Sequence, residues 1–198
     1  MSLDTIPLLD ASGNPLSVRQ GDHVRRFNEL NRIMAGMPDL YEAGKTTSPE
    51  VLESLRKDFQ DTWIISSTRI HYEKTSLEAT ITHYFNNTVI SPNEIKVLVP
   101  DYSGVVSLDK VLKDEQGLKY LQALFNTLDS AETIKTTLEN LSNKKSKDIR
   151  VWTPEQNLRK EAQDRAAGLG YSSGLFLVDG SNNISSDGRS RGVLVSPR

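Results

Sequence analysis

Cysteine is absent from this 198-residue chain, and histidine occurs only three times. The lack of cysteine excludes disulfide bonds, thiolate metal sites and cysteine nucleophiles. Protein metal sites draw heavily on cysteine and histidine, so three histidines argue against a histidine-rich metal centre. We therefore expect neither a bound metal nor a cofactor.

Long hydrophobic runs are also lacking. No segment approaches the roughly 20 apolar residues of a membrane-spanning helix. The opening residues, MSLDTIPLLDASG, contain no basic segment followed by a long apolar one, so no signal peptide is predicted. The chain is expected to stay off the membrane and to lie in the cytoplasm.

A strong net charge is missing as well, because 24 Lys and Arg residues nearly balance 26 Asp and Glu residues. The net charge of −2 gives no general attraction to nucleic acid. The charge is uneven, however: residues 144–198 hold ten basic and six acidic residues, a net of +4, which leaves −6 on the first 143. Either the C-terminal part meets an anion, or the two parts attract each other.

The strongest positive signal is a strand pattern over residues 63–100. β-Branched and aromatic residues alternate there with polar ones. With a turn at Thr75-Ser76, Ile70 lies opposite Ile81, and a third strand follows. One face of this antiparallel meander then carries Ile64, Ile70, Tyr72, Ala79, Ile81 and Phe85.

Apolar residues recur at helical spacing before and after this meander. Helices are predicted over 22–34 and 49–60, and a helical pair follows the meander with its leucine stripe over 118–128. Such a stripe is typical of a core or of a partner interface. Thr153-Pro154-Glu155-Gln156 is a capping box, which predicts a surface helix over 157–167.

Turn dipeptides at Asp179-Gly180 and Asp187-Gly188 separate short apolar runs near the C-terminus. The predicted fold class is therefore α+β, with two small antiparallel meanders over about 63–100 and 149–195 packed with helices, as a single domain or two lobes. One division puts helices and the central meander in 1–106, and a helical hairpin with a basic meander in 107–198. The alternative is one continuous domain.

The polar face of the central meander is the first candidate site. Arg69, His71 and Tyr84 fall on it together, which brings a guanidinium, an imidazole and a phenol within reach of one another. The face is either a binding surface or the solvated side of a half-buried sheet. His83 falls on the apolar face opposite Thr68, where a hydroxyl or carbonyl group is expected to satisfy it as a core histidine.

The second candidate is a pair of arginines in the C-terminal meander. Arg189 and Arg191 stand two residues apart on a predicted strand, among Gly180, Gly188 and Gly192. Two guanidinium groups on one side of a strand, beside glycine-bearing turns, can hold a phosphate or a carboxylate. The alternative is an ordinary hairpin with arginines that favour solubility.

Signatures of enzymes are lacking. The segment Ala43-Gly44-Lys45-Thr46-Thr47 resembles the end of a phosphate-binding loop, but Asp39 stands where the motif requires glycine. The serines of the segment 170–174 do not have the spacing of a nucleophile elbow. No metalloprotease, calcium-loop or dinucleotide motif occurs.

We therefore predict a soluble binding or interaction protein, with a protein partner, a second copy of itself or a small anion as its ligand. The alternative is a small enzyme acting on a phosphate- or carboxylate-bearing substrate, with His71 as base and Arg69 or Arg191 holding the anion. A nucleic-acid-binding module that stacks bases on Arg69, His71 and Tyr84 is a second alternative, which the acidic first part of the chain disfavours.

Overall fold

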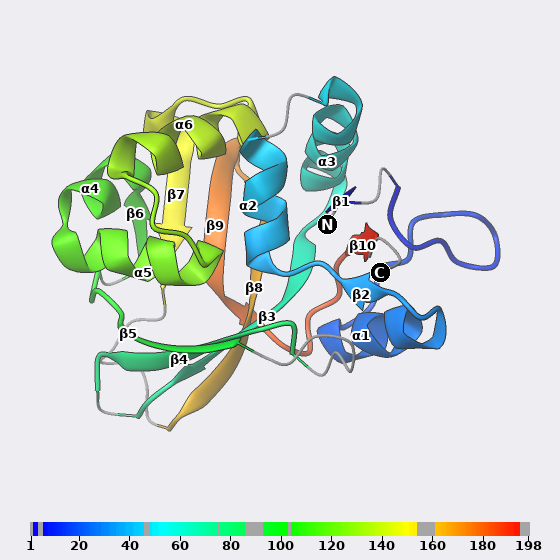
Figure 1. Ribbon diagram of the computed structural model, residues 1–198, viewed down its shortest axis with the longest axis horizontal. Coiled ribbons are helices and arrows are strands. Elements are labelled where there is room, and N and C mark those ends of the chain that lie inside the picture. Colours follow the sequence, from blue (N-terminus) through cyan, green and yellow to red (C-terminus); the bar gives the residue numbers. More distant parts are fainter. Residues whose placement is uncertain are drawn as a thin grey trace.

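The computed structural model describes residues 2–3, 6–45, 48–74, 76–85, 93–102, 104–153 and 161–194. Its frame is a seven-stranded sheet in the order β5-β4-β3-β8-β9-β7-β6 (Figure 1). Its strands are β3 (Ile64–Tyr72), β4 (Glu78–His83), β5 (Asn93–Leu98), β6 (Val105–Ser107), β7 (Ile149–Trp152), β8 (Gln163–Ser172) and β9 (Leu175–Asn183). Neighbouring strands are antiparallel, except that β7 runs parallel to β9. The α+β fold class is confirmed.

A second, three-stranded sheet brings together segments from both ends of the chain. Its order is β1-β10-β2, formed by β1 (Ser2–Leu3), β10 (Gly192–Leu194) and β2 (Ile33–Met34). The central strand β10 is antiparallel to both neighbours. The residues just before β10 also bond to β3 of the large sheet: the Ile65 N–H donates to the Arg189 carbonyl at 2.8 Å.

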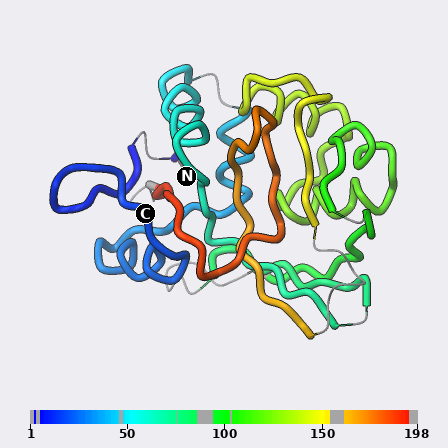
Figure 2. The backbone as a smooth tube through the Cα atoms, turned by 180° about the vertical axis from the view of Figure 1, so that it is seen from behind, coloured from blue at the N-terminus to red at the C-terminus, as the bar shows by residue number. Residues whose placement is uncertain are grey.

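Most helices cover one face of the large sheet. The helices of the described chain are α1 (Gln20–Glu29), α2 (Met37–Lys45), α3 (Pro49–Asp61), α4 (Leu108–Lys113), α5 (Glu115–Phe125) and α6 (Ala131–Ser142), with a short 3-10 helix at Ser146–Asp148. Helices α2, α4, α5 and α6 lie in front of the sheet in Figure 1. In Figure 2, which shows the molecule from behind, the strands lie in front of these helices. Helix α1 instead packs Val24 and Phe27 against Ile65 and Ala166, in a second, smaller core.

The central meander forms with the predicted register. Ile70 pairs with Ile81, Tyr72 with Ala79 and His71 with Thr80. Of the predicted apolar face, Ile64, Ile70, Tyr72, Ala79 and Ile81 are buried. A shift by one residue would carry this set of side chains to the other face of the sheet, so burial fixes the register. The predicted turn residue Thr75 lies outside the described residues.

The prediction for 149–195 is wrong in detail. Residues Gln163–Ser172 form strand β8, whereas a helix over 157–167 was predicted; residues 154–160, with most of its capping box, lie outside the described part. Ala166, Ala167 and Leu169 are fully buried because β8 pairs with β3 on one side and β9 on the other. Such burial inside a sheet outweighs a weak local preference for helix.

Two further features of this region differ. The dipeptide Asp179-Gly180 lies within β9 instead of forming a turn. A Cβ atom on Gly180 would lie 2.2 Å from the Tyr120 hydroxyl oxygen and 2.8 Å from that of Tyr72, so this glycine permits close packing. The closing strand β10 belongs to the smaller sheet, and β7 pairs parallel to β9, so β7, β8 and β9 do not form the predicted antiparallel meander.

The N-terminal helices also end elsewhere than expected. Helix α1 stops at Glu29, Asn31 has a left-handed φ of 52°, and Met34 lies in β2. The segment 37–45, which lies between the two predicted helices, is itself helix α2. The described helices include none long and apolar enough to span a membrane.

The large sheet unites the two predicted parts of the chain, because β3 from 1–106 pairs with β8 from 107–198. The two meanders are therefore joined side by side. The division into 1–106 and 107–198 itself stays a prediction.

Candidate functional site

Arg69 and His71 lie on the sheet face opposite the main helical layer, and each has partners within the chain. Arg69 donates to the Gln20 side-chain oxygen at 3.0 and 3.3 Å, and its guanidinium carbon lies 3.5 Å from the centre of the Phe85 ring. His71 Nδ1 lies 2.9 Å from an Asp164 carboxylate oxygen. The guanidinium is held between an amide and a ring, while the imidazole stays more accessible, with 43% of its side chain exposed.

Tyr84 does not join these two residues, so this part of the prediction is wrong. Tyr84 has a left-handed φ of 55°, which turns the chain just beyond β4. Its hydroxyl donates to Asp39 at 3.2 Å, and its ring packs beside Gly36. Phe85 takes the place beside Arg69, although the alternation predicted Phe85 on the apolar face. One left-handed residue is enough to reverse a period-2 alternation.

His83 is a core histidine, as predicted. Its Nε2 lies 3.0 Å from the Ala123 carbonyl and its Nδ1 lies 3.0 Å from the Thr68 hydroxyl. A carbonyl can only accept, so Nε2 carries the proton. Burial lowers the pKa of His83 below its usual value, because the charged imidazolium loses water. A neutral ring satisfied on both sides is structural.

Arg189 and Arg191 face carboxylates of the chain itself. Arg191 is 1% exposed; its Nε donates to Asp58 at 2.9 Å, and its terminal nitrogen binds Asp58 and Ser54. Arg189 bridges Asp58 at 2.9 Å and Asp61 at 3.1 Å. The carboxylate that these arginines meet thus comes from helix α3. Whether they also hold a free anion stays a prediction.

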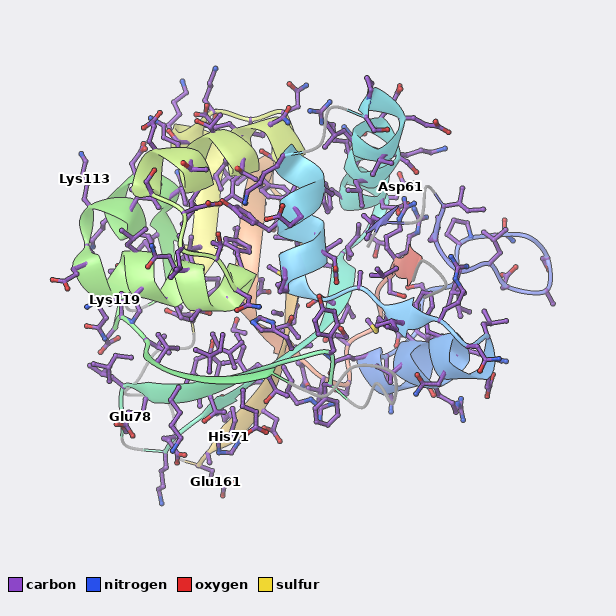
Figure 3. The ribbon with its side chains drawn as sticks, viewed as in Figure 1. Asp61, His71, Glu78, Lys113, Lys119 and Glu161 are labelled. Carbon is purple, nitrogen blue, oxygen red and sulfur yellow. The ribbon has the colours of Figure 1, made fainter. Side chains whose placement is uncertain are left out.

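The predicted site residues fall in two separate places. His71 lies below the sheet in Figure 3, whereas Asp61, the partner of Arg189, lies at the end of α3 in the upper right. Arg191 is enclosed by α3 and so does not face His71, as the enzyme alternative would require. Of the three residues that the enzyme alternative names, only Arg69 and His71 lie near each other, two residues apart on β3.

A buried polar cluster on β9 was not foreseen. Asp179 is fully buried, and one of its oxygens accepts from the Ser181 amide at 2.6 Å and the Ser181 hydroxyl at 2.9 Å. Burial raises the pKa of Asp179 to about 6, against the opposing effect of the Ser181 bonds. The sequence carried no signal for this, because an Asp-Gly pair ordinarily marks a turn.

A groove of about 760 Å³ lies between strand β5 and helix α5. One wall consists of Ile95, Lys96, Val97 and Leu98 of β5. The other includes Glu115, Lys119 and Gln122 along α5, and Asn126 and Leu128 just beyond it. Successive strand residues point to opposite faces, so four in a row can line one groove only where it meets the edge of the strand. Lys119 lies on the helical side of the sheet in Figure 3, opposite His71.

The edge of β5 is open within the described part of the chain, where β4 is its one sheet neighbour. Val99 N–H donates to the Leu77 carbonyl at 2.7 Å. Hydrogen-bonded pairs alternate in an antiparallel ladder, so Ile95 and Val97 also direct their backbone groups to β4. The amides and carbonyls of Glu94, Lys96 and Leu98 therefore point outward, toward the groove.

Large apolar side chains that line the groove are left exposed or half-buried. Leu98 is 51% exposed and Leu128 is 96% exposed, the highest value among the large apolar side chains described. Ile95 and Val97 are only half-buried, although Ile81 and Ala79 opposite them are fully buried. The leucine stripe over 118–128 is thus mostly core: Leu121, Leu124 and Phe125 are buried and Leu118 is half-buried, whereas Leu128 is almost fully exposed. The pattern predicted a core or a partner interface, and the structure places most of the stripe in the core.

No metal site emerges from the described residues, which contain no group of three or more His, Asp or Glu side chains placed to hold an ion. Comparison of the chain with models of protein families, with curated proteins and with solved structures finds no match.

Proposed function

We propose that this chain is a binding protein whose partner adds an extended segment to the open edge of β5. The observation that carries the proposal is the coincidence of two features at one place. Outward-pointing backbone groups of Glu94, Lys96 and Leu98 line the strand edge, and an apolar groove under α5 runs along that same edge. An edge without the groove would be an ordinary end of a sheet.

Strand addition divides the work between backbone and side chains. Main-chain hydrogen bonds to Glu94 and Lys96 supply affinity, whereas alternate side chains of the added segment enter the groove and supply specificity. Ile95, Val97 and Leu128 give that groove its apolar surface, so it favours apolar side chains at every second position. The mode needs no group with a special pKa.

Replacement of Lys96 by proline tests this function. Lys96 lies opposite Thr80 in a pair that exchanges no backbone bonds with β4, so proline at this edge position removes only an outward N–H. Lys96→Ala is the matched control, because it loses the same charge and keeps the amide. Peptides selected on the wild-type protein from a random displayed library should bind Lys96→Pro about tenfold more weakly or worse, and Lys96→Ala within a few-fold of wild type.

Circular dichroism and thermal unfolding establish that both variants are folded. A library that yields no binder, or binders insensitive to Lys96→Pro, would contradict strand addition. Hydrogen exchange adds a residue-level readout: bound peptide should slow exchange at the amides of Glu94, Lys96 and Leu98.

One observation favours the alternative of an enzyme. The Asp164 carboxylate 2.9 Å from His71 Nδ1 is placed to orient the imidazole as a base, with Arg69 two residues away on the same strand. Arg69 is already engaged by Gln20 and Phe85, however, which leaves the anion without a clear holder. Hydrolysis of simple phosphate or carboxylate esters that is lost in His71→Ala would favour this alternative.

A further inference from the structure

We infer that the segment bound at the β5 edge is the β5 strand of a second copy of this chain, related by a two-fold axis through Ile95. The inference rests on the proposed function and names its partner. Two-fold symmetry across a strand edge gives antiparallel pairing and one continuous sheet with both α5 helices on the same face.

The charges of β5 select the axis. Around Ile95, Glu94 lies opposite the partner's Lys96, and by symmetry Lys96 lies opposite the partner's Glu94. Both side chains are exposed, and opposite charges directly across a strand pair stabilise it. An axis through Lys96 would set two lysines against each other, and one through Glu94 would set two glutamates together. An axis through Val97 would leave Lys96 opposite the partner's Leu98.

The backbone agrees with this axis. Directly opposed residues on neighbouring strands share a face, so a two-fold axis perpendicular to the sheet must pass through a residue pair. Glu94 and Lys96 are residues whose amides and carbonyls point outward. The two oppositely charged pairs are therefore also the pairs that exchange both backbone hydrogen bonds.

The apolar side of the strand closes over the same axis. Ile95 would meet the partner's Ile95 beneath the helices. His83 binds the Ala123 carbonyl and pairs with Asn93, so the C-terminal end of α5 lies over the beginning of β5. Leu128 follows that end and lines the same groove as Ile95, so it lies on the side of β5 on which the two copies of Ile95 would meet. Dimerisation would thus cover the most exposed large apolar side chain of the described chain.

Disulfide trapping tests the register, since a chain without cysteine reports on any single cysteine introduced. In the inferred dimer, Ile95 and its copy form a non-hydrogen-bonded pair with Cα atoms about 4.5 Å apart, which a disulfide can bridge. Ile95→Cys should therefore form a covalent dimer under mild oxidation. The two copies of Val97 would lie four residues out of register, about 14 Å apart, so Val97→Cys should remain monomeric on a denaturing gel.

Charge exchange tests the partner. Sedimentation velocity over a range of concentrations should show a wild-type dimer. Glu94→Lys or Lys96→Glu alone places like charges opposite each other at two symmetric positions, and each should raise the dimer dissociation constant about tenfold. The double variant, E94K with K96E, restores both pairs in reverse, and its dissociation constant should return to within about threefold of wild type.

The outcomes separate this inference from the function on which it rests. A wild-type chain that stays monomeric at every concentration, yet binds selected peptides in a manner sensitive to Lys96→Pro, overturns the second copy as partner and leaves strand addition standing. A dimer that is indifferent to the charge exchange, or that crosslinks through Val97→Cys as readily as through Ile95→Cys, overturns the axis through Ile95. A wild-type chain that neither dimerises nor binds any selected peptide overturns both the second copy as partner and strand addition itself.

Discussion

Asp179 shows how one buried carboxyl group can set the pH response of the molecule. It is fully buried on β9, and within the described chain only one of its two oxygens has a hydrogen-bond partner. Burial raises its pKa from the ordinary value of 3.8 to about 6, because the low-dielectric interior penalises the charged form. Protonation of the Asp179 carboxyl group therefore stabilises the native state.

This shift predicts that stability falls as pH rises. The favourable contribution of protonated Asp179 is complete below about pH 3.8 and is lost as pH rises through about 6. Asp179→Asn keeps an oxygen for Ser181 and removes the charge. The variant should be more stable than wild type by up to about 3 kcal/mol at pH 8, and the difference should vanish near pH 4. Urea unfolding across this pH range measures it.

Ser181→Ala is the companion variant. It deletes a hydroxyl that donates to the Asp179 carboxylate at 2.9 Å, so it should destabilise the protein more at pH 8 than at pH 4. An Asp179→Asn effect of the same size at every pH would contradict the buried-carboxyl explanation.

At the scale of elements, an ion cluster ties helix α3 to the segment that leads into β10. Asp58 on α3 is 3% exposed and meets both Arg189 and Arg191. Arg191 is almost wholly buried, whereas 17% of the Arg189 side chain is exposed. The two arginines therefore differ in what each loses when its partner is removed.

Arg191→Ala should destabilise the protein by about 3–5 kcal/mol, because it leaves the buried carboxylate of Asp58 with much of its charge uncompensated. Arg189→Ala, the matched control on the same carboxylate, should cost about 1 kcal/mol, since water can replace part of what it supplies. Denaturant unfolding at neutral pH compares them. Equal losses would contradict the difference in burial as the cause.

Local pattern predicted the central meander well and the C-terminal one poorly. The pairing of β3 with β4 follows from period-2 alternation, which leaves one register with a wholly apolar face. The exchange of Tyr84 and Phe85 does not, because a left-handed tyrosine has no sequence signal. Strand β8 was mistaken for a helix because its partner β3, which lies about 100 residues earlier in the chain, leaves no trace in the local pattern.

At the scale of the whole molecule, the large sheet crosses the predicted division of the chain. Ile64 of β3 pairs with Leu169 of β8, and the ion cluster joins acidic residues of α3 to basic residues near the C-terminus. This cluster accords with an attraction between the acidic and basic parts of the chain. We therefore expect 1–106 and 107–198 to unfold together.

The two tryptophans test that expectation, because one lies in each part. Trp152→Phe leaves Trp63 as the reporter of the first part, and Trp63→Phe leaves Trp152 as the reporter of the second. Fluorescence in urea, with circular dichroism as the reference for each variant, should give transitions with coincident midpoints. Fluorescence and circular dichroism midpoints that separate within either variant would support two lobes.

The sequence by itself determined the α+β class, the register of the central meander and the core position of His83, because each depends on side-chain period and near neighbours. Only the tertiary structure decided the pairing of β8 with β3, the partners of β10, the carboxylate that faces Arg191, and which strand edge remains open at the groove. These depend on contacts between residues far apart in the chain. Local pattern records which face of an element is buried, whereas the packed molecule selects what that face meets.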